Sequence, residues 1–111
     1  MRVRYQLGSS GESRHLDLTP GNVYRVIGIE ADDYRIMNDE GLPYLYPAGD
    51  FLVVDPGEPA EWRTEYGDEG ERYSYPPELG RPGFFEDYFD GKPECVTTLR
   101  RYLAEHRREA S

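Results

Sequence analysis

Residues 18–55, LTPGNVYRVIGIEADDYRIMNDEGLPYLYPAGDFLVVD, decide the fold. Residues 23–29 are rich in β-branched and aromatic side chains, which favours a strand, and Gly28 inside this run indicates a bulge or a bend. Residues 34–37 are expected to return as the next strand, with Tyr34 and Ile36 on one face. The stretch therefore predicts β-structure built from neighbouring strands.

Turn residues separate this pair of strands from its neighbours. Residues 19–22, Thr-Pro-Gly-Asn, and residues 38–41, Asn-Asp-Glu-Gly, have the composition of tight turns, and the second predicts a hairpin. Residues 44–46 lie between two prolines and suit an edge strand, because proline cannot donate a hydrogen bond to a neighbour. Residues 51–54, Phe-Leu-Val-Val, are expected to form the next strand.

Toward the N-terminus, residues 2–7 alternate apolar and polar side chains and predict a short strand. Residues 15–18 could form a second short strand. Five or six short strands joined by tight turns up to residue 55 favour a small all-β barrel.

The C-terminal half has a different pattern. Residues 62–66 and 72–75 could pair as strands across a turn at 67–70. Residues 84–90, FFEDYFD, place four aromatic side chains on one face of a short helix, and Pro93 is suited to the first turn of a last helix. We expect a single domain over residues 1–111, mainly β with C-terminal α. Its parts are a barrel core at 1–55, a β-hairpin or loop extension at 56–83, and a helical segment of one or two helices at 84–109.

Residues 18–55 resemble small bacterial SH3-like barrels. In these proteins a Gly-led turn starts a long strand, an acidic turn follows, and the second strand ends in an N-D-x-G hairpin. The resemblance covers about a third of the chain. It implies an SH3-like β-barrel, and some proteins of this kind are similar to immunity proteins encoded beside toxins. The segment from Trp62 onward has no counterpart in SH3-like barrels.

Composition excludes several classes of protein. The chain has 111 residues, no long apolar run and a net charge of −9. A membrane span needs about 18–20 apolar residues, and an acidic chain repels the phosphates of nucleic acids. Cys95 is the single cysteine, and the first residues lack the apolar core of a signal peptide. We therefore expect a cytoplasmic protein that binds neither membranes nor nucleic acids.

No motif for catalysis, metal binding or cofactor binding is evident. His15 and His106 lie far apart in the sequence, with no other histidine or cysteine near either, and both are expected to be solvated side chains. Cys95 has no evident partner base. Adjacent carboxylates fall mostly in predicted turns, where they favour the turn and charge the surface. We therefore expect a non-enzymatic protein with no metal ion and no cofactor.

Negative charge is concentrated in the middle of the chain. Residues 30–90 carry 17 Asp and Glu against four Arg, a net charge of −13, whereas residues 1–29 and 91–111 each carry +2. Such a segment is either a solvated surface that keeps the protein soluble or a docking surface for a basic protein. The residues predicted to contact such a partner combine acids with aromatic anchors: Asp32, Asp33, Asp39, Glu40, Trp62, Glu65, Tyr66, Asp68 and Glu69.

Three hypotheses for function follow. The first is an acidic protein-binding module, in its most concrete form an immunity protein that blocks the basic active site of a toxin such as a nuclease. The second is a structural or regulatory homo-oligomer that uses the aromatic residues of 84–90 and an exposed strand edge; in solution we expect a monomer or a weak homodimer. The third, ranked last, is a small hydrolase, which would need a pocket joining a histidine to Cys95 or to a carboxylate.

Overall fold

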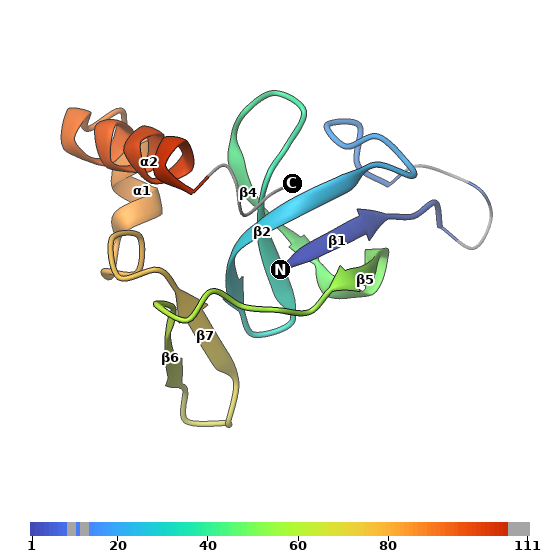
Figure 1. Cartoon of the computed structure of the whole chain (residues 1–111), viewed down its shortest axis with the longest axis horizontal. Coiled ribbons are helices and arrows are strands. Elements are labelled where there is room, and N and C mark those ends of the chain that lie inside the picture. Colours follow the sequence, from blue (N-terminus) through green and yellow to red (C-terminus); the bar gives the residue numbers. More distant parts are fainter. Residues whose placement is uncertain (9–10, 12–13, 107–111) are drawn as a thin grey trace.

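A computed structural model describes residues 1–8, 11 and 14–106 of the chain (Figure 1). The predicted combination of mainly β-structure with C-terminal helices is confirmed. The strands are β1 (Arg2–Tyr5), β2 (Val23–Glu30), β3 (Asp33–Met37), β4 (Pro43–Pro47), β5 (Phe51–Asp55), β6 (Arg63–Tyr66) and β7 (Arg72–Tyr75). The helices are α1 (Phe84–Phe89) and α2 (Pro93–Glu105), and a short 3-10 helix, Ala48–Asp50, precedes β5. Residues 107–109 of the predicted helical segment lie outside the described residues.

The strands form one antiparallel sheet. Five of them follow the order β4-β3-β2-β1-β5, while β7 pairs with the end of β2 and β6 pairs with β7 (Figure 1). Among the residues that the structure describes, no strand pairing joins β4 to β5, so hydrogen bonds do not close this sheet into a barrel. The predicted edge position of β4 is confirmed, because it is the first strand of this order.

The bulge predicted at Gly28 lets β2 contribute side chains to two hydrophobic clusters. The register against β3 shifts between Val26 and Gly28. Side chains normally alternate between the two faces of a strand, but the extra residue puts Val26 and Ile29 on the same face, in the first cluster, while Ile27 joins the second. The first cluster lies among the strands and the second joins β2 to the helices. Buried members of the second are Ile27, Leu79, Phe84, Phe85, Cys95, Leu99 and Tyr102.

The strand considered for residues 15–18 is wrong. These residues form a turn instead, and Leu18 is buried in the first cluster. The backbone N–H groups of Arg14 and His15 donate to the Tyr5 hydroxyl oxygen, at 2.9 and 3.0 Å. A side chain thus satisfies backbone donors that a strand would have paired with a neighbouring strand.

The two helices pack on the far side of β2 from the first cluster. Phe84 and Phe85 are buried, and the ring of Phe89 stacks on Tyr44 of the edge strand with 5.0 Å between centroids. Pro93 occupies the start of α2, as predicted. In the described part of the chain, neither helix has the length and apolar character that a membrane crossing requires.

Candidate functional site

The pairing of β7 with β2 brings two acidic turns to one end of the molecule. Glu30 at the end of β2 pairs with Tyr73, and the Ala31 N–H donates to the Arg72 carbonyl oxygen at 2.7 Å. The turn between β2 and β3, residues 31–32, therefore lies beside the β6–β7 hairpin (Figure 1). Two stretches that are about 35 residues apart in sequence contribute to one surface.

Six of the nine residues predicted to bind a partner belong to these two segments, at this end of the molecule. We call it the hairpin end and define it by Asp32, Asp33, Glu65, Tyr66, Asp68 and Glu69. The side chain of Tyr66 is 71% exposed, and that of Tyr73 on the neighbouring strand is 38% exposed. Tyrosine rings surrounded by charged side chains are typical of protein-binding surfaces, because a rigid ring buries much area at a small entropic cost.

Few cations offset the acids of the hairpin end. Both carboxylate oxygens of Glu58 accept hydrogen bonds from Arg72, at 2.9 and 2.8 Å, so that guanidinium is already neutralised. Arg63 on β6 is exposed, and the same hairpin, residues 63–72, carries four acids. The hairpin end is therefore negatively charged. Tyr66 and Tyr73 project from opposite faces of the hairpin, because Tyr66 pairs with Arg72 and Tyr73 pairs with Glu65.

The other three predicted residues lie elsewhere. Asp39 and Glu40 belong to the β3–β4 hairpin, at the opposite end of β3 from the hairpin end (Figure 1). Trp62 packs against the first cluster and is only partly exposed. Its indole nitrogen is buried, and no residue in the described ranges accepts a hydrogen bond from it. These positions therefore do not extend the surface formed by the other six.

Asp39 has a structural role in the described fold. Its carboxylate accepts hydrogen bonds from the Thr19 hydroxyl at 2.6 Å and from the Tyr24 hydroxyl at 2.7 Å. These bonds, that from Thr19 first, hold the pKa of Asp39 below its usual range. The carboxylate therefore ties the β3–β4 hairpin to the turn before β2.

A groove of about 370 Å³ opens between the β6–β7 hairpin and residues 79–86. On its floor lies Arg35, which is 8% exposed and donates hydrogen bonds to Glu30 at 2.8 Å, to the Pro43 carbonyl at 2.9 Å and to the Tyr75 hydroxyl at 3.0 Å. The guanidinium also lies 4.0 Å from the centroid of the Phe85 ring. Arg35 thus joins four elements, and its charge is paired rather than presented to a ligand.

The Tyr75 hydroxyl completes this network. It donates to Glu30 at 2.5 Å, and burial, the largest cause, raises the pKa of Tyr75 far above its usual value. The hydroxyl therefore stays protonated at neutral pH. Together these contacts give the groove floor a structural role, because they connect β2, β3 and β7.

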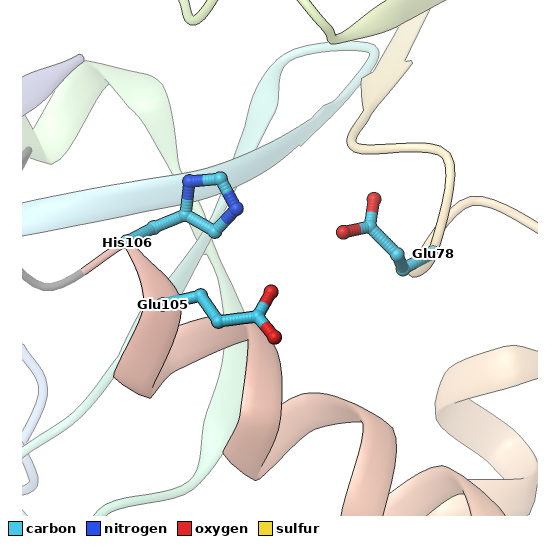
Figure 2. A group of neighbouring side chains, drawn as sticks. All are labelled: Glu78, Glu105 and His106. Carbon is cyan, nitrogen blue, oxygen red and sulfur yellow. The ribbon is translucent and has the colours of Figure 1, made fainter.

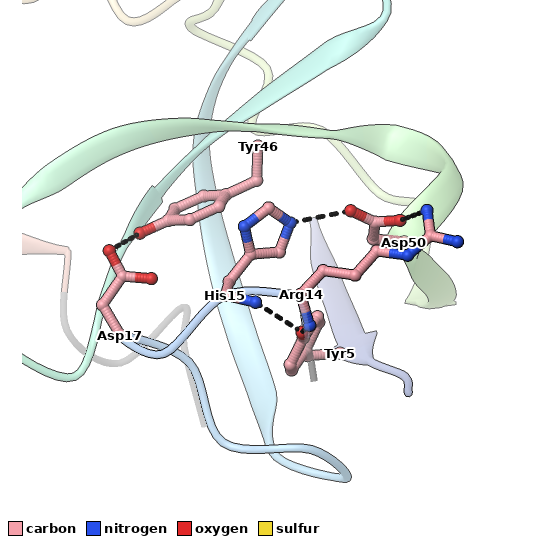
Figure 3. A network of polar contacts seen from close by, with 6 residues as sticks. All are labelled: Tyr5, Arg14, His15, Asp17, Tyr46 and Asp50. Atoms are coloured by element: carbon pink, nitrogen blue, oxygen red, sulfur yellow. Dashed lines mark hydrogen bonds and ion pairs between the residues drawn. The ribbon is translucent and has the colours of Figure 1, made fainter. Parts of the chain in front are cut away.

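A second polar network covers the first cluster (Figure 3). His15 Nε2 lies 2.7 Å from Asp50, and the ring meets Tyr46 edge-on with 5.0 Å between centroids. The Tyr46 hydroxyl donates to Asp17 at 2.9 Å, and burial raises the pKa of Tyr46. The expectation of a solvated His15 is wrong, because the turn at 15–18 lays the imidazole against the cluster and beside a carboxylate.

A third group of polar side chains lies at the end of α2. Glu78, Glu105 and His106 each place one potential ligand atom within 4.8 Å of the others (Figure 2). The adjacent pair Glu105 and His106 is visible in the sequence, but nothing near it indicates Glu78, which lies in the segment between β7 and α1. Sequence reasoning therefore missed this group.

Cys95 is buried in the second cluster, as its position on the apolar face of α2 allows. Arg81 Nη2 lies 3.0 Å from its sulfur and also donates to Asp87 at 2.9 Å. The cysteine packs as a small apolar side chain.

No protein-family model matches the sequence, and no curated protein or solved structure matches it either. The geometry and charge of the regions described above are therefore the evidence that bears on function.

Proposed function

We propose that the protein is a non-enzymatic binding module whose hairpin end docks a basic protein. One observation carries this proposal: the β2–β7 pairing places the acidic β2–β3 turn beside the acidic β6–β7 hairpin, which carries the exposed ring of Tyr66. A negative surface of this kind steers a basic partner during encounter, and the ring of Tyr66 supplies contact area once the partner is bound. The attraction between exposed charges weakens as salt screens them.

We also propose an SH3-like barrel for residues 1–55. The order β4-β3-β2-β1-β5, with a 3-10 helix just before the last strand, is the order expected for such a barrel and supports the resemblance of residues 18–55. A fold by itself does not determine function. In the immunity-protein form of the proposal, carboxylates of the hairpin end take the place of phosphates in the basic active site of a toxin, and the bound protein blocks that site.

Affinity capture from a lysate of the source cells tests the docking. The variant Asp68→Lys/Glu69→Lys reverses two charges on the hairpin end, and Glu40→Lys/Glu94→Lys makes the same change in net charge at other exposed positions. We expect the wild type and the control to retain the same basic protein at low salt and the hairpin variant to lose it. High salt should weaken the capture. Equal retention by both variants would remove the proposal.

The exposed edge of β5 favours a second candidate function, self-association. Leu52, Val53 and Val54 are 50%, 41% and 42% exposed and lie on the last strand of the sheet order. Consecutive exposed apolar residues on an unpaired edge can pair with another chain. Light scattering after gel filtration should give a dimer that Val54→Lys dissociates. A monomeric wild type at every concentration would eliminate this candidate.

A further inference from the structure

Two segments far apart in sequence meet at the C-terminal end of α2. Glu105 and His106 end the helix, and Glu78 follows β7. Figure 2 shows both carboxylates and one side of the imidazole turned toward the same space, with the ligand atoms within 4.8 Å of one another. We propose that these three residues bind a divalent transition-metal ion, with Zn²⁺ the best fit.

The imidazole of His106 lies beside two residues of the described fold. It stacks on the buried ring of Tyr102, with 4.3 Å between centroids, and its Nδ1 lies 3.7 Å from a carboxylate oxygen of Glu61. Nε2 is the ring nitrogen on the side of Glu78 and Glu105 (Figure 2). A histidine that binds a metal ion commonly has a carboxylate at its other nitrogen, which fixes the tautomer and the ring orientation. Glu61 has the place of that carboxylate.

The donor set fits Zn²⁺ chemically. Zinc accepts imidazole nitrogen and carboxylate oxygen, and three protein ligands leave a fourth position for water. Bonds of about 2.0–2.2 Å place the ligands of a tetrahedral ion about 3.4 Å apart. The donor atoms therefore need to close by up to about 1.4 Å, which side-chain rotation of the exposed Glu78 and Glu105 can supply.

Charge also favours a cation at this position. Three carboxylates, those of Glu61, Glu78 and Glu105, gather around one imidazole, and like charges at short range repel. The guanidinium of Arg25 lies over the Tyr102 ring, 5.2 Å from its centroid, and His106 stacks on the same ring. A bound ion would link the end of α2 to the segment after β7 and would stabilise the folded chain by mass action.

Zinc titration of the untagged protein tests the site. The chain has two histidines, His15 and His106, so imidazole NMR resolves one from the other. We expect one equivalent of ZnCl₂ to shift the His106 resonances and to leave those of His15 in place. Competition with a chromophoric chelator should give a Kd for the wild type, and Zn²⁺ should raise its melting temperature.

Variants then locate the ligands. His106→Gln and Glu78→Gln should each raise the Kd about 10- to 100-fold, whereas Glu61→Gln should raise it less, because Glu61 acts through the ring. Glu94→Gln, at an exposed position near the start of α2, is the matched control and should bind as the wild type does. Circular dichroism checks that each variant is folded.

Three results would overturn the proposal. One is the absence of a His106 shift at one equivalent. Another is zinc affinity that Glu78→Gln leaves unchanged. The last is Ca²⁺ binding as tight as Zn²⁺ binding and insensitive to His106→Gln, which would indicate only a surface cluster of acids. None of these results depends on the hairpin end, so they test this site independently of the docking proposal.

Discussion

Gly28 lets Tyr75 of β7 pack against the backbone of β2, because glycine has no Cβ. A Cβ at this position would overlap the aromatic ring of Tyr75, which packs directly on the backbone of β2. In Gly28→Ala the ring must move away from its position beside Phe85 and Glu30. We expect the free energy of unfolding to fall by about 1–3 kcal/mol, measured by urea denaturation, because overpacking forces neighbours out of place.

Gly49→Ala is the control for this substitution. Gly49 lies in the 3-10 helix, and a Cβ there would have no atom within 4 Å. Its unfolding free energy should change by no more than about 0.5 kcal/mol. If Gly28→Ala were as mild as this control, the close approach of Tyr75 to β2 would not hold in solution.

Asp39 makes a pH-dependent contribution at the residue scale. Hydrogen bonds from Thr19 and Tyr24 lower its pKa in the folded state, so the unfolded chain binds a proton more readily. The stability from these bonds is therefore present above the unfolded pKa of 3.8 and is lost as the pH falls through the lower folded value. We expect Asp39→Asn to cost about 1 kcal/mol at pH 7, a modest value because the carboxylate is exposed.

Urea denaturation at pH 7 and at pH 3 checks the sign of this effect. The difference between wild type and Asp39→Asn should shrink at the lower pH. Glu40→Gln removes the neighbouring exposed charge and should show little change at either pH. A difference that grew toward acid would show that the carboxylate is not stabilised in its ionised form.

At the scale of elements, the hydroxyl of Tyr75 joins β7 to β2 and β3. Tyr75→Phe keeps the ring against Phe85 but removes the hydrogen bonds with Glu30 and Arg35. We expect a loss of about 1–3 kcal/mol, because a buried guanidinium and a carboxylate each lose a partner. Hydrogen exchange of the β6–β7 amides should be faster in Tyr75→Phe than in the wild type.

Tyr66→Phe removes a hydroxyl from the exposed ring at the end of β6 and serves as the comparison. Its stability and its amide exchange should match the wild type. If Tyr75→Phe also left stability and amide exchange unchanged, the hairpin would be held to the sheet by backbone pairing alone.

The strands and tight turns were largely predictable because their signals are local. The hairpin at residues 38–41 has Gly41 at a φ of +77°, which glycine adopts without strain, and Pro93 opens α2. The bulge at Gly28 was also predictable from one residue. The pairing of β2 with β7 was not, because it depends on the fit of Tyr75 against Gly28 and not on any pattern within either strand.

The candidate sites were likewise only partly predictable from the sequence. The acids of the hairpin end are visible in the sequence as part of one charged segment that also contains Asp39. The β2–β7 pairing is needed to show that they lie at the opposite end of β3 from Asp39. Trp62 was predicted to contact a partner, whereas in the fold it is partly buried and packs against the first cluster. The group of Glu78 and His106 depends on where α2 packs, which no spacing in the sequence encodes.

At the scale of the whole molecule, β2 connects both hydrophobic clusters. Val26 and Ile29 pack in the first cluster and Ile27 packs in the second. Unfolding of β2 therefore removes side chains from both clusters. Two clusters that share a strand are expected to unfold together, as most small domains do. The single tryptophan, Trp62, reports on the first cluster, whereas the helices that cover the second dominate the circular dichroism signal at 222 nm.

Leu99→Ala tests this coupling. Leu99 is 1% exposed in the second cluster, so its truncation should cost about 2–5 kcal/mol of unfolding free energy. We expect the Trp62 fluorescence transition, which reports on the other cluster, to move to lower urea together with the helical signal. Thr97→Ala, on the exposed face of α2, should move neither transition by more than about 0.5 kcal/mol. Helices that melted first, while Trp62 kept its native emission, would mean that the shared strand does not transmit the loss and that the clusters are separate folding units.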